Sequence, residues 1–346
     1  MIFKTNKDIF RITIELLENI NEKYLYQALD RTLKTFKSFK KKESNNIIKK
    51  NLEINENEVI IHKNLTYKKN KINSKSNNYH LIKVAYENNI ITIDFSYLLT
   101  DAYGAKLFVQ EIVYNYLRLV HHQLKPQPKL QLTFTTIKTK NNTNIHSKVY
   151  KIEGKKLPQN NVNTYEFFID KKETTTSISI ISLIIYSILK TKPIEKTNSV
   201  IVGLPINLRT KNELNNISYQ SIIPVINIEN SFSIDEISSL ITKEYKNIEN
   251  NEYTISKNIT TTIYNLETIN LKEEYNQYVK NIFFTLMPTS KEHFRCGITT
   301  YKNRIYISFS SDITDVSFIS NFKKILEDNN INHDIKSNNN DFIKFD

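Results

Sequence analysis

The sequence predicts a mixed α/β protein of about two lobes, and three observations lead to this prediction. Segments in which apolar and polar residues alternate, as in half-buried strands, occur between segments with apolar residues at helical spacing. The chain of 346 residues is long enough for two cores. Four glycines and seven prolines exclude collagen-like and low-complexity chains, and no apolar run reaches the roughly 18 residues of a membrane-spanning helix.

The N-terminal half is expected to form one lobe. Leu25, Leu29 and Leu33 fall at helical spacing, with lysines on the other side, as in a helix that lies on a sheet. The elements expected here are a strand at 10–16, a helix at 21–37, short strands and loop at 40–80, a strand at 90–95 and a long helix from about Gly104 to Val120. The polar segment from Lys125 to about Pro158 predicts a linker, so we expect lobes of residues 1–157 and 158–346.

The C-terminal half repeats this mixture. Residues 178–189 are ambiguous, because their β-branched side chains favour a strand whereas their length and all-round apolar surface favour a buried helix; we predict a helix. Ser233 and Glu236 form a predicted capping box before another helix. The other expected elements are strands at 165–169, 199–204, 221–228, 281–286 and 304–309, and a closing helix at 317–326.

The charge and cysteine content exclude several classes of function. The formal net charge is +12, but almost all of the basic residues are lysines scattered among Asn and Ile, without an arginine stripe or an RNA-binding signature, so we expect no specific nucleic-acid binding. The seven histidines have no ligand spacing, which predicts no metal site. Cys296 is the only cysteine and is expected to be a packing residue. Since the N-terminus lacks the apolar core of a signal peptide, we expect a cytoplasmic protein.

The turn between strand 90–95 and the following helix carries the most informative motif, because such turns expose side chains beside free helix N–H groups. Its sequence, Phe95-Ser96-Tyr97-Leu98-Leu99-Thr100-Asp101-Ala102-Tyr103-Gly104-Ala105, resembles the His-x-x-x-Asp-Gly region of the acyl-CoA-dependent acyltransferase superfamily. That superfamily includes chloramphenicol acetyltransferase, condensation domains and bacterial alcohol acetyltransferases, and the last branch is the most similar.

Three further segments resemble the alcohol acetyltransferase branch in the same order along the chain. Val202–Arg209 is similar to its Pro-Val-Asn-Leu-Arg strand end, and Asn281-Ile282-Phe283 lies where the family tends to have Ser-Asn-Leu-Gly. Thr300–Ile305 looks like its Ser-Tyr-Asn-Asn-Lys-Leu hairpin. The resemblance therefore extends over roughly residues 8 to 335.

This resemblance implies a two-lobed fold like that of chloramphenicol acetyltransferase, with a mixed sheet and helices in each lobe and a tunnel between the lobes. Acyl-CoA or an acyl-carrier pantetheine arm enters one mouth of such a tunnel, and a small alcohol or amine enters the other. The motif His acts as general base on the acceptor. The resemblance implies no permanently bound cofactor and makes acyl-CoA the expected co-substrate.

Carried over residue by residue, the resemblance assigns Tyr97 to the position of the catalytic His, Ser96 to the residue before it and Ala102 to the motif Gly. It implies that Asp101 pairs with Arg209 and holds the loop in shape, with Asn207 in the same structural motif. The residues that it implies for the substrate tunnel are Tyr103, Gly104, Asn281 and Phe283.

The substitution at Tyr97 leaves two functions open. A phenol has an ordinary pKa near 10 and is a poor general base at neutral pH. Tyr97 therefore has three readings: a buried aromatic residue, a catalytic group or a ligand contact. The protein is either a CoA-dependent acyltransferase that uses Tyr97 or another residue, or an inactive relative that binds a small molecule or a protein partner.

Overall fold

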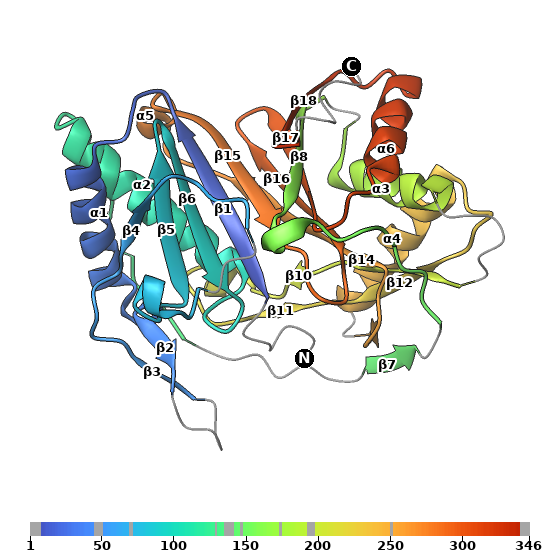
Figure 1. Ribbon diagram of the computed structural model, residues 1–346, viewed down its shortest axis with the longest axis horizontal. Helices are drawn as coiled ribbons and strands as arrows, with labels where there is room; N and C mark the ends of the chain where they lie inside the picture. The colour runs from blue at the N-terminus through green and yellow to red at the C-terminus, as the bar shows by residue number, and fades with distance from the viewer. Residues whose placement is uncertain are drawn as a thin grey trace.

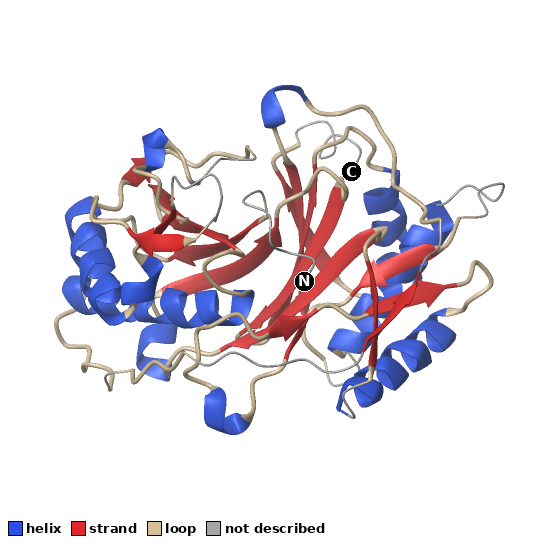
Figure 2. Ribbon diagram, turned by 90° about the horizontal axis from the view of Figure 1, so that it is seen from below, coloured by secondary structure: helices blue, strands red, loops and turns tan. Residues whose placement is uncertain are grey.

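The computed structural model describes residues 8–44, 51–68, 72–128, 130–134, 142–145, 148–172, 175–191, 198–249 and 252–339. Each of two lobes consists of a mixed sheet with helices on its outer side, and the two sheets meet at the centre of the molecule (Figure 1, Figure 2). The predicted fold class is therefore confirmed. Among the residues described, no helix is both long and apolar enough to cross a membrane.

The N-terminal lobe is built on a five-stranded sheet in the order β15-β1-β6-β5-β4. Its elements are β1 (Ile9–Leu16), α1 (Glu22–Thr35), β4 (Ile61–Lys63), β5 (Ile82–Glu87), β6 (Ile90–Ser96), α2 (Ala102–Val120) and β15 (Val279–Leu286). The short strands β2 (Lys41–Glu43) and β3 (Leu52–Ile54) form a separate hairpin. Along β1 the side chains of Phe10, Ile12, Ile14 and Leu16 are buried in the same core as α1 and α2, so the side chains that alternate with them face the other lobe.

The C-terminal lobe is built on a seven-stranded sheet in the order β12-β9-β14-β16-β17-β8-β18. Its strands are β8 (Asn163–Asp170), β9 (Val200–Gly203), β12 (Val225–Ile228), β14 (Thr261–Ile269), β16 (Phe294–Tyr301), β17 (Arg304–Ser311) and β18 (His333–Ser337). Its helices are α3 (Ser177–Thr191), α4 (Ile234–Glu249) and α6 (Ser317–Asp328). Smaller elements are β10 (Ile206–Asn207), β11 (Ser221–Ile222), β7 (Asn142–Ile145), β13 (Tyr253–Ser256) and α5 (Glu273–Asn276).

The ambiguous segment 178–189 lies within α3, as predicted. Ile180, Ile184 and Ile188 are fully buried, and α3 contacts both α4 and α6, so its apolar surface is covered on several sides. The capping box before α4 is also present. Ser233 N donates to Glu236 Oε2 at 2.7 Å, and Glu236 N donates to Ser233 Oγ at 3.3 Å.

Two expected elements differ from the structure. The single strand expected at 221–228 is divided into β11 and β12, because Pro224 has no N–H to donate and interrupts the ladder. The segment expected to be only a linker contains β7, which pairs in parallel with β13.

The boundary between residues 157 and 158 does not separate the two sheets, because β15 lies in the N-terminal sheet. It pairs antiparallel with β1 in a register in which Thr13 faces Phe283. Its other side contacts the C-terminal sheet, where Thr285 Oγ1 and Ser308 Oγ are 2.7 Å apart. Strand β15 therefore joins the two lobes, and Figure 1 shows it at the place where they meet.

Candidate functional site

Asp101 is the structural centre of the motif turn. It is the N-cap of α2, and its Oδ1 accepts a hydrogen bond from Gly104 N at 3.0 Å. The same carboxylate accepts hydrogen bonds from Gln220 N and Ser221 Oγ, both at 2.9 Å. Since the Asp101 side chain is fully buried, these bonds replace its hydration.

Arg209 completes this network, so the structure brings together the pair that the resemblance implies. Its two terminal nitrogens each donate to a different Asp101 oxygen at 2.9 Å, in a bidentate arrangement. Arg209 Nη1 also donates to Asn207 Oδ1 at 2.8 Å, and Nε donates to Asn216 O at 2.6 Å. The network ties the start of α2 to the segment after β10, so it fixes the turn in which Tyr97 lies.

Tyr97, at the position of the motif His, is only 3% exposed. Its ring packs on Phe10 at 4.6 Å between centroids and lies 6.4 Å from the ring of Tyr219. Ser96 is also buried, and its Oγ accepts a hydrogen bond from Leu98 N at 3.2 Å. Tyr97 lines neither of the two cavities described below.

Burial sets the acid–base behaviour of Tyr97. Removal from water raises the pKa of its phenol well above the ordinary value near 10, and the nearby Arg295 guanidinium opposes this rise only in part. At neutral pH the phenol therefore stays protonated and is a still weaker base than an exposed tyrosine.

The four residues expected in a substrate tunnel lie in three different places. Gly104 packs in the first turn of α2, where a Cβ would overlap Thr100 Oγ1. Tyr103 lines a cavity of about 680 Å³, where Arg209 lies over its ring at 4.7 Å. Phe283 lines a different cavity, and Asn281 lies beside that cavity, donating to Glu15 Oε2 at 2.6 Å and accepting from the Tyr306 hydroxyl at 2.9 Å.

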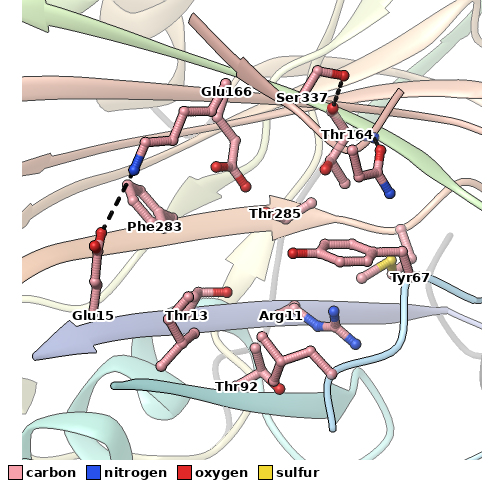
Figure 3. A pocket seen from close by; sticks show the side chains of 15 residues that line it. Arg11, Thr13, Glu15, Tyr67, Thr92, Thr164, Glu166, Phe283, Thr285 and Ser337 are labelled. Atoms are coloured by element: carbon pink, nitrogen blue, oxygen red, sulfur yellow. Dashed lines mark hydrogen bonds and ion pairs between the residues drawn. The ribbon is translucent and has the colours of Figure 1, made fainter. Parts of the chain in front are cut away.

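The cavity next to Phe283 lies between the two sheets and has a volume of about 230 Å³. Its floor is a polar strip of the N-terminal sheet: Thr13 of β1 pairs with Phe283 of β15 and with Thr92 of β6. Its roof comes from β8 and β18, and Figure 3 shows Glu166 directed into the space above Phe283 and Thr285. This interlobe cavity is therefore built from strands far apart in the sequence.

The charges around the interlobe cavity are mostly paired. Arg11 Nε and Nη2 donate to the two oxygens of Asp94 at 2.6 and 2.9 Å. Glu15 accepts from Lys280 at 2.8 Å, and Lys336 Nζ lies 3.9 Å from Glu15 Oε2.

Glu166 differs from these groups. It faces Lys336 across the β8–β18 ladder, but its carboxyl accepts no hydrogen bond from any residue that the structure describes. Burial raises the pKa of the Glu166 carboxyl from 4.5 to about 7, against the opposing effect of Lys336.

Glu166 is a residue that the sequence analysis missed. The available signal is its position in strand 165–169, where it is the one carboxylic acid among Tyr165, Phe167, Phe168 and Ile169. No group of three or more His, Cys, Asp or Glu side chains that could hold a metal ion occurs within the described ranges.

The comparisons with known proteins identify the fold. No family model matches the sequence, and no curated protein matches it. Polyketide synthase associated protein 5 from Mycobacterium tuberculosis is similar in structure, with a TM-score of 0.61 and 12% identity over 92% of this chain and 93% of that chain. A mutant starter condensation domain of rhizomide synthetase, solved in complex with C8-CoA and Leu-SNAC, gives a TM-score of 0.60 and 11% identity over 93% of this chain and 88% of that chain.

A third similar structure is the epimerization domain from the third module of tyrocidine synthetase B. Its TM-score is 0.57 at 10% identity, over 93% of this chain and 92% of that chain. Identities at this level show the fold alone. The chain has the two-lobed fold of condensation domains, and the superfamily resemblance seen in the sequence is confirmed at the level of the fold.

Proposed function

We propose that this protein is a non-catalytic binding scaffold with the condensation-domain fold, which holds a small molecule between its lobes. The observation that carries the proposal is the burial of Tyr97, which keeps its phenol protonated. The residue at the position of the general base is packed on Phe10, and its phenol stays protonated at neutral pH. The interlobe cavity offers a separate polar space for a ligand.

The part of the motif that the sequence retains, Asp101 with its partner Arg209, supports the same proposal. Asp101 and Arg209 keep a fully buried bidentate pair, which orders the turn and the first turn of α2. This pair performs no proton transfer itself. A protein that keeps the pair and replaces the base retains the scaffold of the fold without the chemistry that the motif His supplies.

The experiment is free-thiol release from acetyl-CoA across a panel of alcohols and amines, with wild type, Tyr97→Phe and Tyr97→His. We expect no acceptor-dependent release from wild type or from Tyr97→Phe. Acceptor-dependent turnover by wild type that Tyr97→Phe abolishes would contradict the proposal, because the phenol would then be a working catalytic group. Activity gained only by Tyr97→His would support it, since the substrate path would be intact and only the base would be missing.

A second candidate function is acyl transfer with a relocated base. The observation that favours it is Glu166, whose pKa of about 7 suits a general base at neutral pH and whose carboxyl faces the interlobe cavity. The same thiol-release assay decides this case. Turnover that persists in Tyr97→Phe and falls by about 10²-fold or more in Glu166→Gln would favour this function over the scaffold.

A further inference from the structure

The interlobe cavity contains polar groups that the protein itself leaves available. Among the described residues, neither the Thr13 nor the Thr92 hydroxyl has a hydrogen-bond partner, and the same is true of the Glu166 carboxyl. These oxygen atoms are reached from the cavity, where water or a ligand can bond to them. Three such groups around one cavity indicate that a ligand or water supplies the missing bonds.

The net charge of the cavity wall argues for an uncharged ligand. The charged side chains that line the cavity are Arg11 and Lys336, which are positive, and Glu15 and Glu166, which are negative. These charges balance once Glu166 is ionised, above pH 7. A ligand with a net charge would leave the charges of this partly buried wall unbalanced, which is costly.

The hydrogen-bonding groups on the cavity wall further limit the chemical class of the ligand. An ionised carboxylate only accepts hydrogen bonds, whereas a threonine hydroxyl both donates and accepts them. A ligand hydroxyl can donate to Glu166 while neighbouring hydroxyls exchange bonds with Thr13 and Thr92. The rings of Phe283 and Tyr67 also line the cavity and offer apolar surface to C–H groups.

The volume of the cavity indicates the size class of the ligand. A volume of about 230 Å³ equals roughly seven or eight water molecules at ~30 Å³ each. This space fits a molecule of monosaccharide size.

We propose that the interlobe cavity binds a neutral polyhydroxylated molecule of monosaccharide size, with one ligand hydroxyl donating to Glu166 and others bonding to Thr13 and Thr92. This inference rests on the proposed function, because it names the class of small molecule that the scaffold holds. Glu166 and the two threonines are binding residues here.

The test measures equilibrium binding by ligand-observed NMR titration, with D-glucose, D-ribose and myo-inositol as polyol probes. Ethanolamine and acetate serve as a cationic and an anionic comparison. The variants are Glu166→Gln, which keeps the shape and removes the charge, and Thr13→Val, which replaces a hydroxyl by a methyl group on a strand. Glu273→Gln on α5 is the matched control, because Glu273 is exposed and does not line the cavity.

We expect wild type to bind at least one polyol, and each cavity variant to weaken this binding about tenfold, which is the effect of one hydrogen bond to a charged or buried group. The control should bind as wild type does. Thermal unfolding of each variant checks that it is folded. If Glu166→Gln does not fold, the comparison of Thr13→Val with wild type still tests the proposal.

The pH dependence of binding gives an independent readout. Binding by wild type should strengthen from pH 6 to pH 8 as Glu166 ionises, and binding by Glu166→Gln should not change with pH. The other titratable or charged groups that face Glu166 are Arg11 and Glu15 on β1, Tyr67 and Lys336. Burial raises the pKa of Tyr67 above 10, and hydrogen bonds from Lys280 and Asn281 outweigh burial to lower the pKa of Glu15 below 4.5, so neither titrates in this range.

The possible failures can be told apart. Absence of polyol binding, or polyol binding that both cavity variants leave unchanged, would overturn the ligand class. If ethanolamine or acetate binds instead and Glu166→Gln removes that binding, the scaffold function stands with a different ligand. If no probe binds, both proposals fail. Polyol binding together with polyol-dependent thiol release from acetyl-CoA would overturn the scaffold function and keep the ligand class.

Discussion

The Asp101 carboxylate combines a helix cap with a buried ion pair. It bonds to Gly104 N at the start of α2 and to the guanidinium of Arg209, which lies on a segment of the other lobe. Removal of one partner of such a pair leaves the other charge buried without compensation, and this is costly. Loss of Asp101 should therefore strongly destabilise the folded protein, even though Tyr97 occupies the catalytic position of the motif.

Asp101→Asn is expected to lower the free energy of unfolding by about 3 kcal/mol, because Arg209 then stays buried next to a neutral amide. Urea denaturation monitored by circular dichroism measures this. The control is Asp30→Asn, which breaks an exposed ion pair with Lys34 on α1 and should change the stability by less than about 0.5 kcal/mol. Equal effects of the two substitutions would contradict the buried-pair argument.

Glu166 should make the stability of the protein depend on pH. Because burial raises its pKa from 4.5 to about 7 in the folded state, the folded protein binds more protons than the unfolded chain between these values. The contribution of Glu166 to stability is therefore greatest below pH 4.5 and is lost as the pH rises through 7. Glu166→Gln should be more stable than wild type at pH 8, by on the order of 2 kcal/mol, and close to it at pH 5.

Urea denaturation of both proteins at pH 5 and pH 8 tests this dependence. A difference between wild type and Glu166→Gln that is the same at both pH values would contradict a raised pKa.

At the residue scale the sequence predicted some groups and not others. The resemblance implied Asp101, Arg209 and Asn207, and these residues do meet. It could not indicate that Glu166 lies at the interlobe cavity, because that position depends on which strand lies opposite β8. The alternation along β8 indicates that Glu166 faces away from Tyr165 and Phe167, but only the tertiary structure brings Thr13 and Thr92 beneath it.

At the scale of elements, periodicity predicted those with one apolar face. The helices α1, α2, α4 and α6 follow this rule, and so does the strand β1. The strand β8 does not, because Phe168 is buried in the N-terminal core while Phe167 and Ile169 are buried in the C-terminal core. The strand β16 does not, because all eight of its residues are buried and no alternation remains in the sequence. The division of 221–228 into two strands depends on one residue, Pro224, whose effect on a ladder is local and could have been predicted.

Gly297 in β16 is expected to tolerate no side chain. A Cβ there would overlap the carbonyl oxygen of Phe284 in β15, because β16 and β15 pack closely against each other at this point. Gly297→Ala should lower the free energy of unfolding by about 2–3 kcal/mol. Chemical denaturation measures this.

Gly203 in β9 is the matched control. A Cβ at Gly203 would meet side-chain methyl groups of Ile223 and Ile259 at 3.1 Å, and these can shift. Gly203→Ala should therefore cost less than Gly297→Ala, and the reverse order would argue against the close approach of the sheets.

At the scale of the whole molecule, the two-lobed architecture was predicted by the resemblance and by chain length. The membership of β15 in the N-terminal sheet could not be predicted from local pattern, because its alternation is the same in either sheet. The pairing of β15 with β1 joins residues that are far apart in the sequence, such as Phe10 and Leu286. Long-range pairing of this kind leaves no periodic signal in either segment.

We expect that neither half of the chain is stable alone. A fragment of residues 1–157 lacks β15 and exposes the edge of β1, whose unpaired N–H and C=O groups promote association with other chains. Expressed separately, this fragment should be insoluble or oligomeric by size-exclusion chromatography. Co-expression with residues 158–346 is the control, and a monomeric, folded 1–157 fragment would contradict the expectation.

The late position of β15 in the chain also affects how the protein is made. On the ribosome, β1 is complete at Leu16, but its partner strand ends only at Leu286, about 270 residues later. At ~5–20 residues per second this separation lasts on the order of tens of seconds. During that time the nascent N-terminal lobe has an open sheet edge, so its partners in the cell should include the chaperones that bind such edges until β15 has been synthesised.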